Sequence, residues 1–179
     1  MKSFVDERLW YVIQTRSRFE KKCADLLAKN GISAYLPLQK KMSVWSDRIK
    51  EVETPLFPGY LFVQFSENER YPILNTPGVV RFISFGGKYA TINIKQMNAV
   101  QKAITSDLEL EVVDIVFEPG QEVLITSGPF KDNYARLVRH NGKGKLLLTI
   151  DSIGKGILLE IGRTQVEAKN KRATSKVEA

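Results

Sequence analysis

The side chains best suited to chemistry in this sequence are aromatic, and the chemistry they suit is binding. Several of the nine Phe, six Tyr and two Trp gather in strand-like segments: Trp10, Tyr11, Phe57, Tyr60, Phe62, Phe65, Phe82 and Phe85. Because successive side chains of a strand point to opposite faces, the run 57–65 must place some rings on each face of a sheet. Rings turned inward are ordinary core. Rings left outside would form a docking patch, since aromatic residues dominate interface energetics.

Patterns that would indicate catalysis are missing from the sequence. His140 is the only histidine, and it precedes the turn signal Asn141-Gly142, so an exposed turn residue is a better interpretation than a general base. The segments 142–145 and 154–156 are basic and glycine-rich, but neither has the spacing of a phosphate loop. No pair of carboxylates stands out for acid–base work. We therefore expect no enzymatic activity and no cofactor.

Cysteine and histidine are too few for two common kinds of site. One Cys, Cys23, and one His exclude an internal disulfide and a Cys/His zinc site. Cys23 shares a helical stripe with Phe19, Leu26 and Leu27, which favours packing over reactivity. The start of the chain lacks the apolar run of a signal peptide, and no stretch is long enough to span a bilayer. These features predict a cytoplasmic protein without membrane contact.

The net charge of +7 is unevenly distributed. Residues 1–104 carry 16 basic and nine acidic side chains, whereas residues 105–120 carry five acids and no base. A basic surplus in the first part of the chain fits contact with phosphate, although ordinary solubility accounts for such a charge equally well. The basic residues near the first predicted helix, Arg16, Arg18, Lys21, Lys22 and Lys29, could follow a phosphate backbone without reading bases, or could be a solvated face.

The first hundred residues have the pattern of an α+β domain with a mostly antiparallel sheet. Strand-like runs occupy 9–14, 32–38, 56–65, 79–85 and 88–92, and 40–53 reads as a projecting hairpin. Helices are predicted after a capping box at 17–20, over 66–75, and after Asn93, where Met97, Val100 and Ile104 share one face. The Pro58-Gly59 pair inside the third run predicts a bulge or an edge.

The last third of the chain has a different pattern, with short strands joined by tight turns. The strands are predicted at 121–126, 134–139, 145–150 and 157–161, which suggests a small barrel. Between the two parts, the acidic residues 105–117 predict an extended, solvated linker. We therefore divide the chain into a domain at 1–104, the linker at 105–117, a barrel at 118–167 and a disordered tail at 168–179.

Two sets of motifs resemble one known family. The segments 10–15 (WYVIQT), 55–63 (PLFPGYLFV) and 76–82 (TPGVVRF) are similar to the amino-terminal domain of NusG-type transcription factors. The segment 119–130 (PGQEVLITSGPF) is similar to a KOW domain, an SH3-like barrel. The resemblance covers about residues 9–167, with both motif sets in the right order.

The resemblance implies a monomeric partner of bacterial RNA polymerase. The amino-terminal domain would dock on the clamp helices of the largest polymerase subunit through the set Tyr11, Phe57, Pro58, Tyr60, Phe62 and Phe82. The first helix would meet upstream or non-template DNA through Arg16, Lys22, Lys29 and Asn30. In the KOW half, the loop with Phe130, Asn133 and Tyr134 corresponds to the loop that, in general NusG, helps recruit Rho or a small-subunit ribosomal protein.

Within the family, the chain is more similar to specialised RfaH- and UpxY-type paralogues. The segments 55–62 and 69–79 are the basis of this similarity, and Asn133 is at a position where the KOW loop usually has an aromatic residue. The resemblance therefore implies a processive antiterminator for polysaccharide biosynthesis operons. One alternative is a general NusG factor, which assists Rho. Another, from a different class, is a ribosomal or RNA-binding KOW protein.

Overall fold

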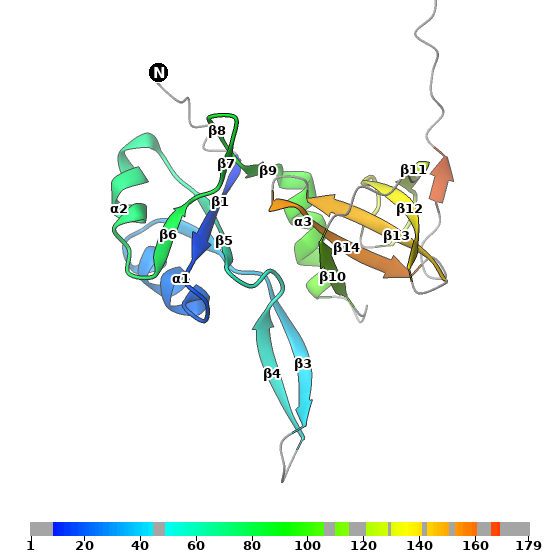
Figure 1. Cartoon of the computed structure of the whole chain (residues 1–179), viewed down its shortest axis with the longest axis horizontal. Coiled ribbons are helices and arrows are strands. Elements are labelled where there is room, and N and C mark those ends of the chain that lie inside the picture. Colours follow the sequence, from blue (N-terminus) through cyan, green and yellow to red (C-terminus); the bar gives the residue numbers. More distant parts are fainter. Residues whose placement is uncertain are drawn as a thin grey trace, which may run out of the picture.

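In the residues that it describes, the computed structural model has two main antiparallel sheets, three α-helices and two smaller hairpins (Figure 1). It describes residues 9–44, 49–105, 110–114, 121–128, 130–140, 143–150, 153–160 and 166–168. The amino-terminal half is α+β and the carboxy-terminal half is built from strands, so the predicted class of fold is confirmed at the level of a sheet-rich α+β protein.

The amino-terminal sheet has five strands arranged around β1. Its strands are β1 (Trp10–Thr15), β2 (Ser33–Tyr35), β5 (Tyr60–Gln64), β6 (Val79–Phe82) and β9 (Thr91–Ile92). The order is β2-β5-β1-β6, with β9 also paired to β1. All of its described pairings are antiparallel, as predicted. Three consecutive residues of β1, Tyr11, Val12 and Ile13, are buried, so both faces of this strand are covered.

Helices cover the two faces of this sheet. The face with Tyr11 and Ile13 belongs to a core that includes residues of α1 (Glu20–Lys29) and α2 (Arg70–Leu74). The face with Val12 and Phe62 belongs to a core that includes residues of α3 (Ile94–Ile104). A short 3-10 helix, η1 (Glu67–Glu69), precedes α2. The predicted cap of α3 is confirmed, since the Asn93 side chain accepts a hydrogen bond from the Gln96 amide.

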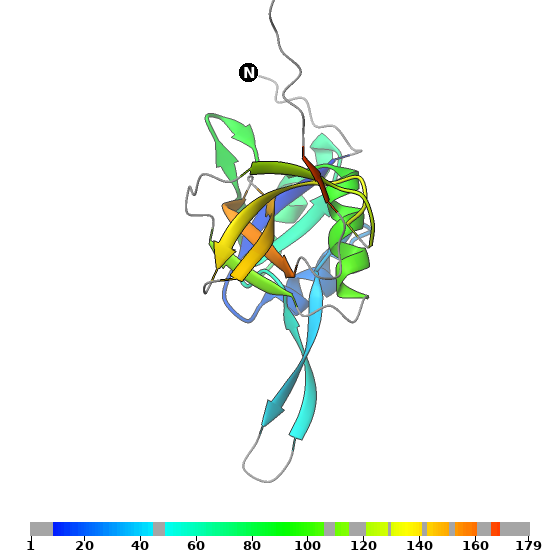
Figure 2. The ribbon, with the colours of Figure 1, turned by 90° about the vertical axis from the view of Figure 1, so that its right-hand side faces the viewer.

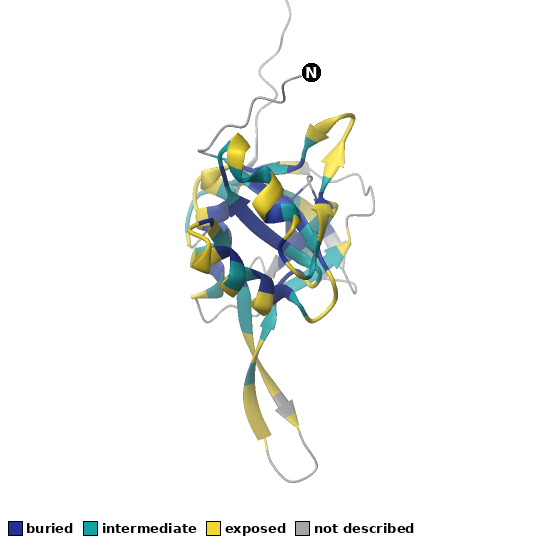
Figure 3. Cartoon of the chain, turned by 90° about the vertical axis from the view of Figure 1, so that its left-hand side faces the viewer, coloured by how far each residue is buried: buried dark blue, intermediate teal, exposed yellow. Residues whose placement is uncertain are grey.

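Two hairpins extend from the amino-terminal half. The strands β3 (Leu38–Val44) and β4 (Ile49–Pro55) form a ribbon that projects far from the body of the molecule (Figures 1 and 2). The pair β7 (Ser84–Phe85) and β8 (Lys88–Tyr89) turns through Gly86 and Gly87, as predicted. Figure 3 shows the long ribbon largely in the colours of exposed and intermediate residues, in contrast to the dark blue strand behind α1 and α2.

The carboxy-terminal sheet has six strands in the order β10-β14-β13-β12-β11-β15. Their bounds are β10 (Glu111–Asp114), β11 (Gln121–Ile125), β12 (Tyr134–His140), β13 (Lys143–Ile150), β14 (Lys155–Glu160) and β15 (Val166–Ala168). The four predicted strands are confirmed. One hydrophobic cluster runs from the Phe62 face of the first sheet through α3 into this sheet, so the two halves share buried apolar surface.

The acidic segment between the halves is not only a linker. Residues 111–114 form β10, which pairs antiparallel with β14, and β10 carries two acids that meet lysines of the sheet. The Lys145 Nζ lies 2.9 Å from a carboxylate oxygen of Glu111. The prediction of a solvated connection is therefore wrong for these four residues, because pairing with β14 satisfies their backbone. Residues 106–109 and 115–120 lie outside the described residues. Of the predicted disordered tail at 168–179, only Ala168 is described, and it ends β15, so the prediction is wrong for this residue.

Gly78, between α2 and β6, allows a close approach of the chain to α1. Its φ of +97° lies in the left-handed region, and an added Cβ would lie 2.8 Å from Sγ of Cys23 and 2.7 Å from Cδ1 of Phe19. Cys23 is fully buried, and burial, together with the nearby Glu20 carboxylate, raises the pKa of its thiol. This fits the predicted packing role of Cys23.

We expect Gly78→Ala to lower the free energy of unfolding by about 2 kcal/mol or more, since it adds steric overlap to an unfavourable φ. Urea unfolding followed by circular dichroism measures the change. Gly87→Ala is the matched control, because Gly87 also has a positive φ but has open space around it, and it should cost only about 1 kcal/mol. Equal losses in both variants would contradict the steric account.

Candidate functional site

The turn 57–60, which enters β5, is held by one backbone hydrogen bond to β1 and one within the turn. The Thr15 amide donates to the Gly59 carbonyl over 2.9 Å, and the Tyr60 amide donates to the Phe57 carbonyl over 3.2 Å. Gly59 has a φ of +81°, which glycine adopts without strain. The predicted strand 56–65 is therefore regular only from Tyr60, and the Pro-Gly pair forms a turn rather than a bulge.

A buried carboxylate on α1 fixes the tip of this turn. The Gly59 amide donates to Oε1 of Glu20 over 2.8 Å, and Glu20 is only 4% exposed. The predicted capping box at 17–20 is not formed, because Arg18 has a φ of +65° and the helix begins at Glu20 with Phe19 as its cap. Glu20 therefore bonds to the turn instead of its own helix end. Local sequence spacing alone could not show this contact over 39 residues.

Five of the six residues predicted to meet a polymerase pack on two different faces of the sheet, and Pro58 lies in the turn. Phe57 and Phe62 belong to the core on the α3 side, with ring centroids 6.1 Å apart at 82°, and Tyr60 packs against that core. Tyr11 and Phe82 belong to the core on the α1 and α2 side. The alternation of β1 and β5 is the cause.

Burial separates the members of this set that a partner could touch from those that it could not. Phe57 and Phe62 are fully buried, and Tyr11 and Phe82 are 4% and 7% exposed. Pro58 is exposed and Tyr60 is half-buried. In this conformation only the Pro58–Tyr60 edge is accessible from outside among these six residues, and the buried rings lie beneath it.

Two further residues extend this edge, and sequence reasoning did not identify them. Gln14 lies opposite Tyr60 on one side and opposite Arg81 on the other, so the three form a row across β5, β1 and β6. The Arg81 Nε donates to Oε1 of Gln14 over 2.9 Å, which leaves the guanidinium exposed at the end of the row. Arg81 lies within the recognised segment 76–82, but only the strand register places it beside Tyr60.

The predicted DNA-contacting residues are all on the surface. Arg16, Lys22, Lys29 and Asn30 are exposed. Lys22 and Lys29 are seven residues apart on α1 and therefore project from the same side of the helix. The Lys22 Nζ lies 5.7 Å from the centre of the Phe19 ring. Lys22 and Lys29 therefore lie on the side of α1 that is turned away from the core, and Arg16 lies before the helix begins.

The predicted partner loop of the carboxy-terminal sheet has one exposed aromatic ring. Phe130 is buried in the core, whereas Tyr134 is 51% exposed. The Asn133 Nδ2 donates to the carbonyls of Phe130 and Lys131 over 3.1 and 3.2 Å, so this amide shapes the loop itself.

Within the described ranges, no three His, Cys, Asp or Glu side chains are placed to hold a metal ion. No helix in the described part of the chain is long and apolar enough to cross a membrane.

Comparison with known proteins gives one consistent result. Residues 8–101 match the family described as transcription termination factor nusG. The transcription termination/antitermination proteins NusG of Staphylococcus aureus strains Mu50 and N315 are each 28% identical over 189 residues, which cover 93% of this chain and 99% of the relative. A solved structure of Thermotoga maritima NusG, described by its domain interaction, has a TM-score of 0.53 at 23% identity and covers 88% of this chain and 96% of that chain. This last likeness concerns the fold.

We expect Glu20→Ala to lower the free energy of unfolding by about 2 kcal/mol, because the Gly59 amide would lose a charged acceptor. Glu20→Gln keeps an acceptor oxygen and should lose less. Hydrogen exchange of the Gly59 amide, measured by NMR, should quicken in Glu20→Ala. An unchanged exchange rate would show that this bond does not hold the turn.

Proposed function

This chain belongs to the NusG family of transcription termination and antitermination factors, and from that membership we propose that it binds RNA polymerase as a specialised processive antiterminator. The Pro58–Tyr60 edge would dock on the clamp helices of the largest subunit. The observation that carries this proposal is the Glu20–Gly59 bond. The buried carboxylate of Glu20 holds the Gly59 amide at the surface turn. This bond fixes the shape of the Pro58–Tyr60 edge before a partner binds, which lowers the ordering cost of binding.

The electrostatics of α1 support a second contact, with upstream or non-template DNA. Lys22 and Lys29 project from one side of α1, and Arg16 and Asn30 lie beside its two ends. Side chains of this kind contact phosphate without reading sequence, so the contact would weaken with salt. A polymerase held at its clamp and at the DNA fork would pause less, and this role requires no catalysis or cofactor.

The carboxy-terminal half, as a KOW barrel at 118–167 following a domain at 1–104, would recruit a further partner. The small-subunit ribosomal protein and Rho are the two candidates that the family suggests. Only Tyr134 among the predicted loop residues offers an exposed ring, and Asn133 is engaged with the loop backbone. Interfaces lose much of their affinity without aromatic anchors. This favours a specialised factor that does not assist Rho, acting as a cytoplasmic monomer on polysaccharide operons.

Two other functions remain as alternatives. A general NusG factor is supported equally by the family and by the relatives, and it would enhance Rho-dependent termination. A ribosomal or RNA-binding KOW protein would bind RNA tightly through the carboxy-terminal half. In that half Lys145 and Lys155 each pair with an acid of β10, which reduces the charge that these two side chains could offer to RNA.

We expect the double variant Pro58→Ala, Tyr60→Ala to bind core RNA polymerase at least about tenfold more weakly than the wild type, because it removes the exposed edge of the turn. A pull-down at moderate salt followed by titration measures the affinity. Phe57→Ala is unsuitable for this test, since emptying a fully buried site would cost about 3–5 kcal/mol of stability.

Phe85→Ala is the matched control, because Phe85 is an aromatic ring 64% exposed on the separate β7–β8 hairpin. It should bind like the wild type. Failure of the wild type to bind core polymerase would refute the proposed function. Equal binding by the double variant would refute the assigned surface.

A transcription assay separates the two NusG-type functions. With purified polymerase and Rho on a template carrying a Rho-dependent terminator, we expect this protein to reduce pausing without raising termination. The proportion of terminated transcript measures the effect. A rise in that proportion would instead identify a general NusG factor.

A further inference from the structure

The projecting hairpin β3–β4 has two chemically different faces. The register pairs Val44 with Ile49 and Met42 with Glu51, which places these four residues on one face because cross-strand partners point the same way. Met42, Val44 and Ile49 are 67%, 79% and 65% exposed. Large apolar side chains gathered on one exposed face indicate an interaction site rather than core. We call Met42, Val44 and Ile49 the apolar tip.

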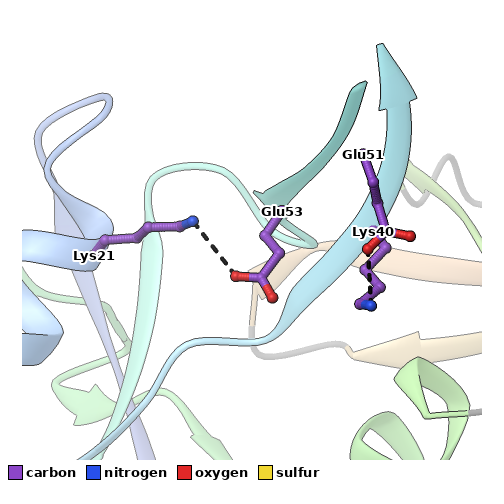
Figure 4. Close-up of polar contacts among 4 residues, drawn as sticks. All are labelled: Lys21, Lys40, Glu51 and Glu53. Atoms are coloured by element: carbon purple, nitrogen blue, oxygen red, sulfur yellow. Dashed lines mark ion pairs between the residues drawn. The ribbon is translucent and has the colours of Figure 1, made fainter. Parts of the chain in front are cut away.

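Charged residues on the same face are paired with acids or bases of the chain itself. The Lys40 Nζ lies 2.8 Å from Oε1 of Glu51, and the hydrogen bond that Lys40 donates to Glu51 raises the pKa of Lys40 (Figure 4). The Lys21 Nζ of α1 lies 3.8 Å from Oε2 of Glu53, which links the ribbon to the helix (Figure 4). This face therefore presents apolar side chains and ion pairs whose charges cancel. It offers no unpaired cation of the two ion pairs to a phosphate group.

The other face of the ribbon differs in its charge. Lys41 lies opposite Val52, and Lys50 lies opposite Ser43, so neither lysine has an acid as its cross-strand partner. If the hairpin met nucleic acid, this second face would do so, because unneutralised cations supply phosphate affinity. The two faces can therefore be tested separately by substitution.

The face of the ribbon that carries the apolar tip continues toward the Pro58–Tyr60 edge. At the base of the ribbon it carries the pair Leu38 and Pro55, which line a groove of about 1730 Å³ together with Phe57 and Pro58. Leu110, Val112 and Leu158 of the carboxy-terminal half line the same groove. A protein surface seated on Pro58 would thus lie next to the face that leads to the apolar tip.

From this continuity and charge pattern we infer that the apolar tip is a second contact with core RNA polymerase, docking on an uncharged apolar patch of its protein surface. The inference rests on the proposed function. A two-stranded ribbon with water on both faces is only marginally stable by itself. Covering one face by a partner stabilises it, and its length lets it reach a point distant from the Pro58–Tyr60 edge.

The test compares two variants of the full chain in binding to purified core polymerase at moderate and high salt. The triple variant Met42→Ser, Val44→Ser, Ile49→Ser should bind at least about tenfold more weakly at both salt concentrations, since apolar contact is not screened. The control Lys41→Ser, Lys50→Ser alters the other face and should bind like the wild type. All five positions belong to the exposed ribbon, and equal melting temperatures confirm intact folds.

A second measurement does not depend on affinity. In Val44→Cys the new thiol is exposed while Cys23 is buried, so alkylation of this chain reports on the tip. Bound polymerase should protect the thiol at least about tenfold, since docking at the tip excludes the reagent from most bound molecules.

The outcomes separate this inference from the proposed function. If the wild type binds polymerase but the triple variant binds equally well and Val44→Cys stays reactive, the tip does not dock and the proposed function stands. If the lysine variant alone loses affinity, and only at moderate salt, the ribbon docks through the charged Lys41 and Lys50 face instead, and the inference is wrong. If the wild type does not bind, the proposed function itself is refuted.

Discussion

The burial of β1 on both of its faces is the constraint on which the amino-terminal half depends. Tyr11, Val12 and Ile13 are consecutive and almost fully buried, so two separate layers must cover the sheet. The helices α1 and α2 supply one layer and α3 supplies the other. A strand of this kind carries apolar residues without alternation. Every aromatic ring of β1 and β5 is consequently assigned to one layer or the other, and few rings are left for a partner.

The turn before β5 is not covered by either layer, because it is not part of the sheet. Gly59 takes a left-handed conformation in open space, and its two hydrogen-bonding groups go to Thr15 and Glu20. The backbone groups of Gly59 are therefore satisfied within the protein and do not depend on water. Pro58 and Tyr60 can then contact another protein without a large ordering cost. The buried rings of Phe57 and Phe62 give this edge a rigid base.

The exposed surfaces available to partners are of two chemical kinds, apolar and cationic, and they lie at different places on the molecule. Apolar contact is available at the Pro58–Tyr60 edge and at the tip of the long ribbon, while cations gather on the outer side of α1. Apolar surface provides affinity that salt does not remove, and cations provide attraction to phosphate that salt does remove. A factor that travels with a polymerase on DNA would use the apolar surface for attachment to the enzyme. It would use the cations for contact with phosphates, which are the same whatever the DNA sequence.

Sequence alone determined the elements whose signals are local. The strand predicted at 9–14 and observed as β1, the amphipathic stripe with Cys23 and the Asn93 cap were all predicted, because periodicity and capping depend on near neighbours. The tertiary structure decided the rest. It divided the aromatic set between two faces, joined Glu20 to Gly59 across 39 residues, placed Arg81 beside Gln14 and moved residues 111–114 into a sheet. Each of these depends on strand register or on contacts between distant segments, and a linear pattern does not specify such contacts.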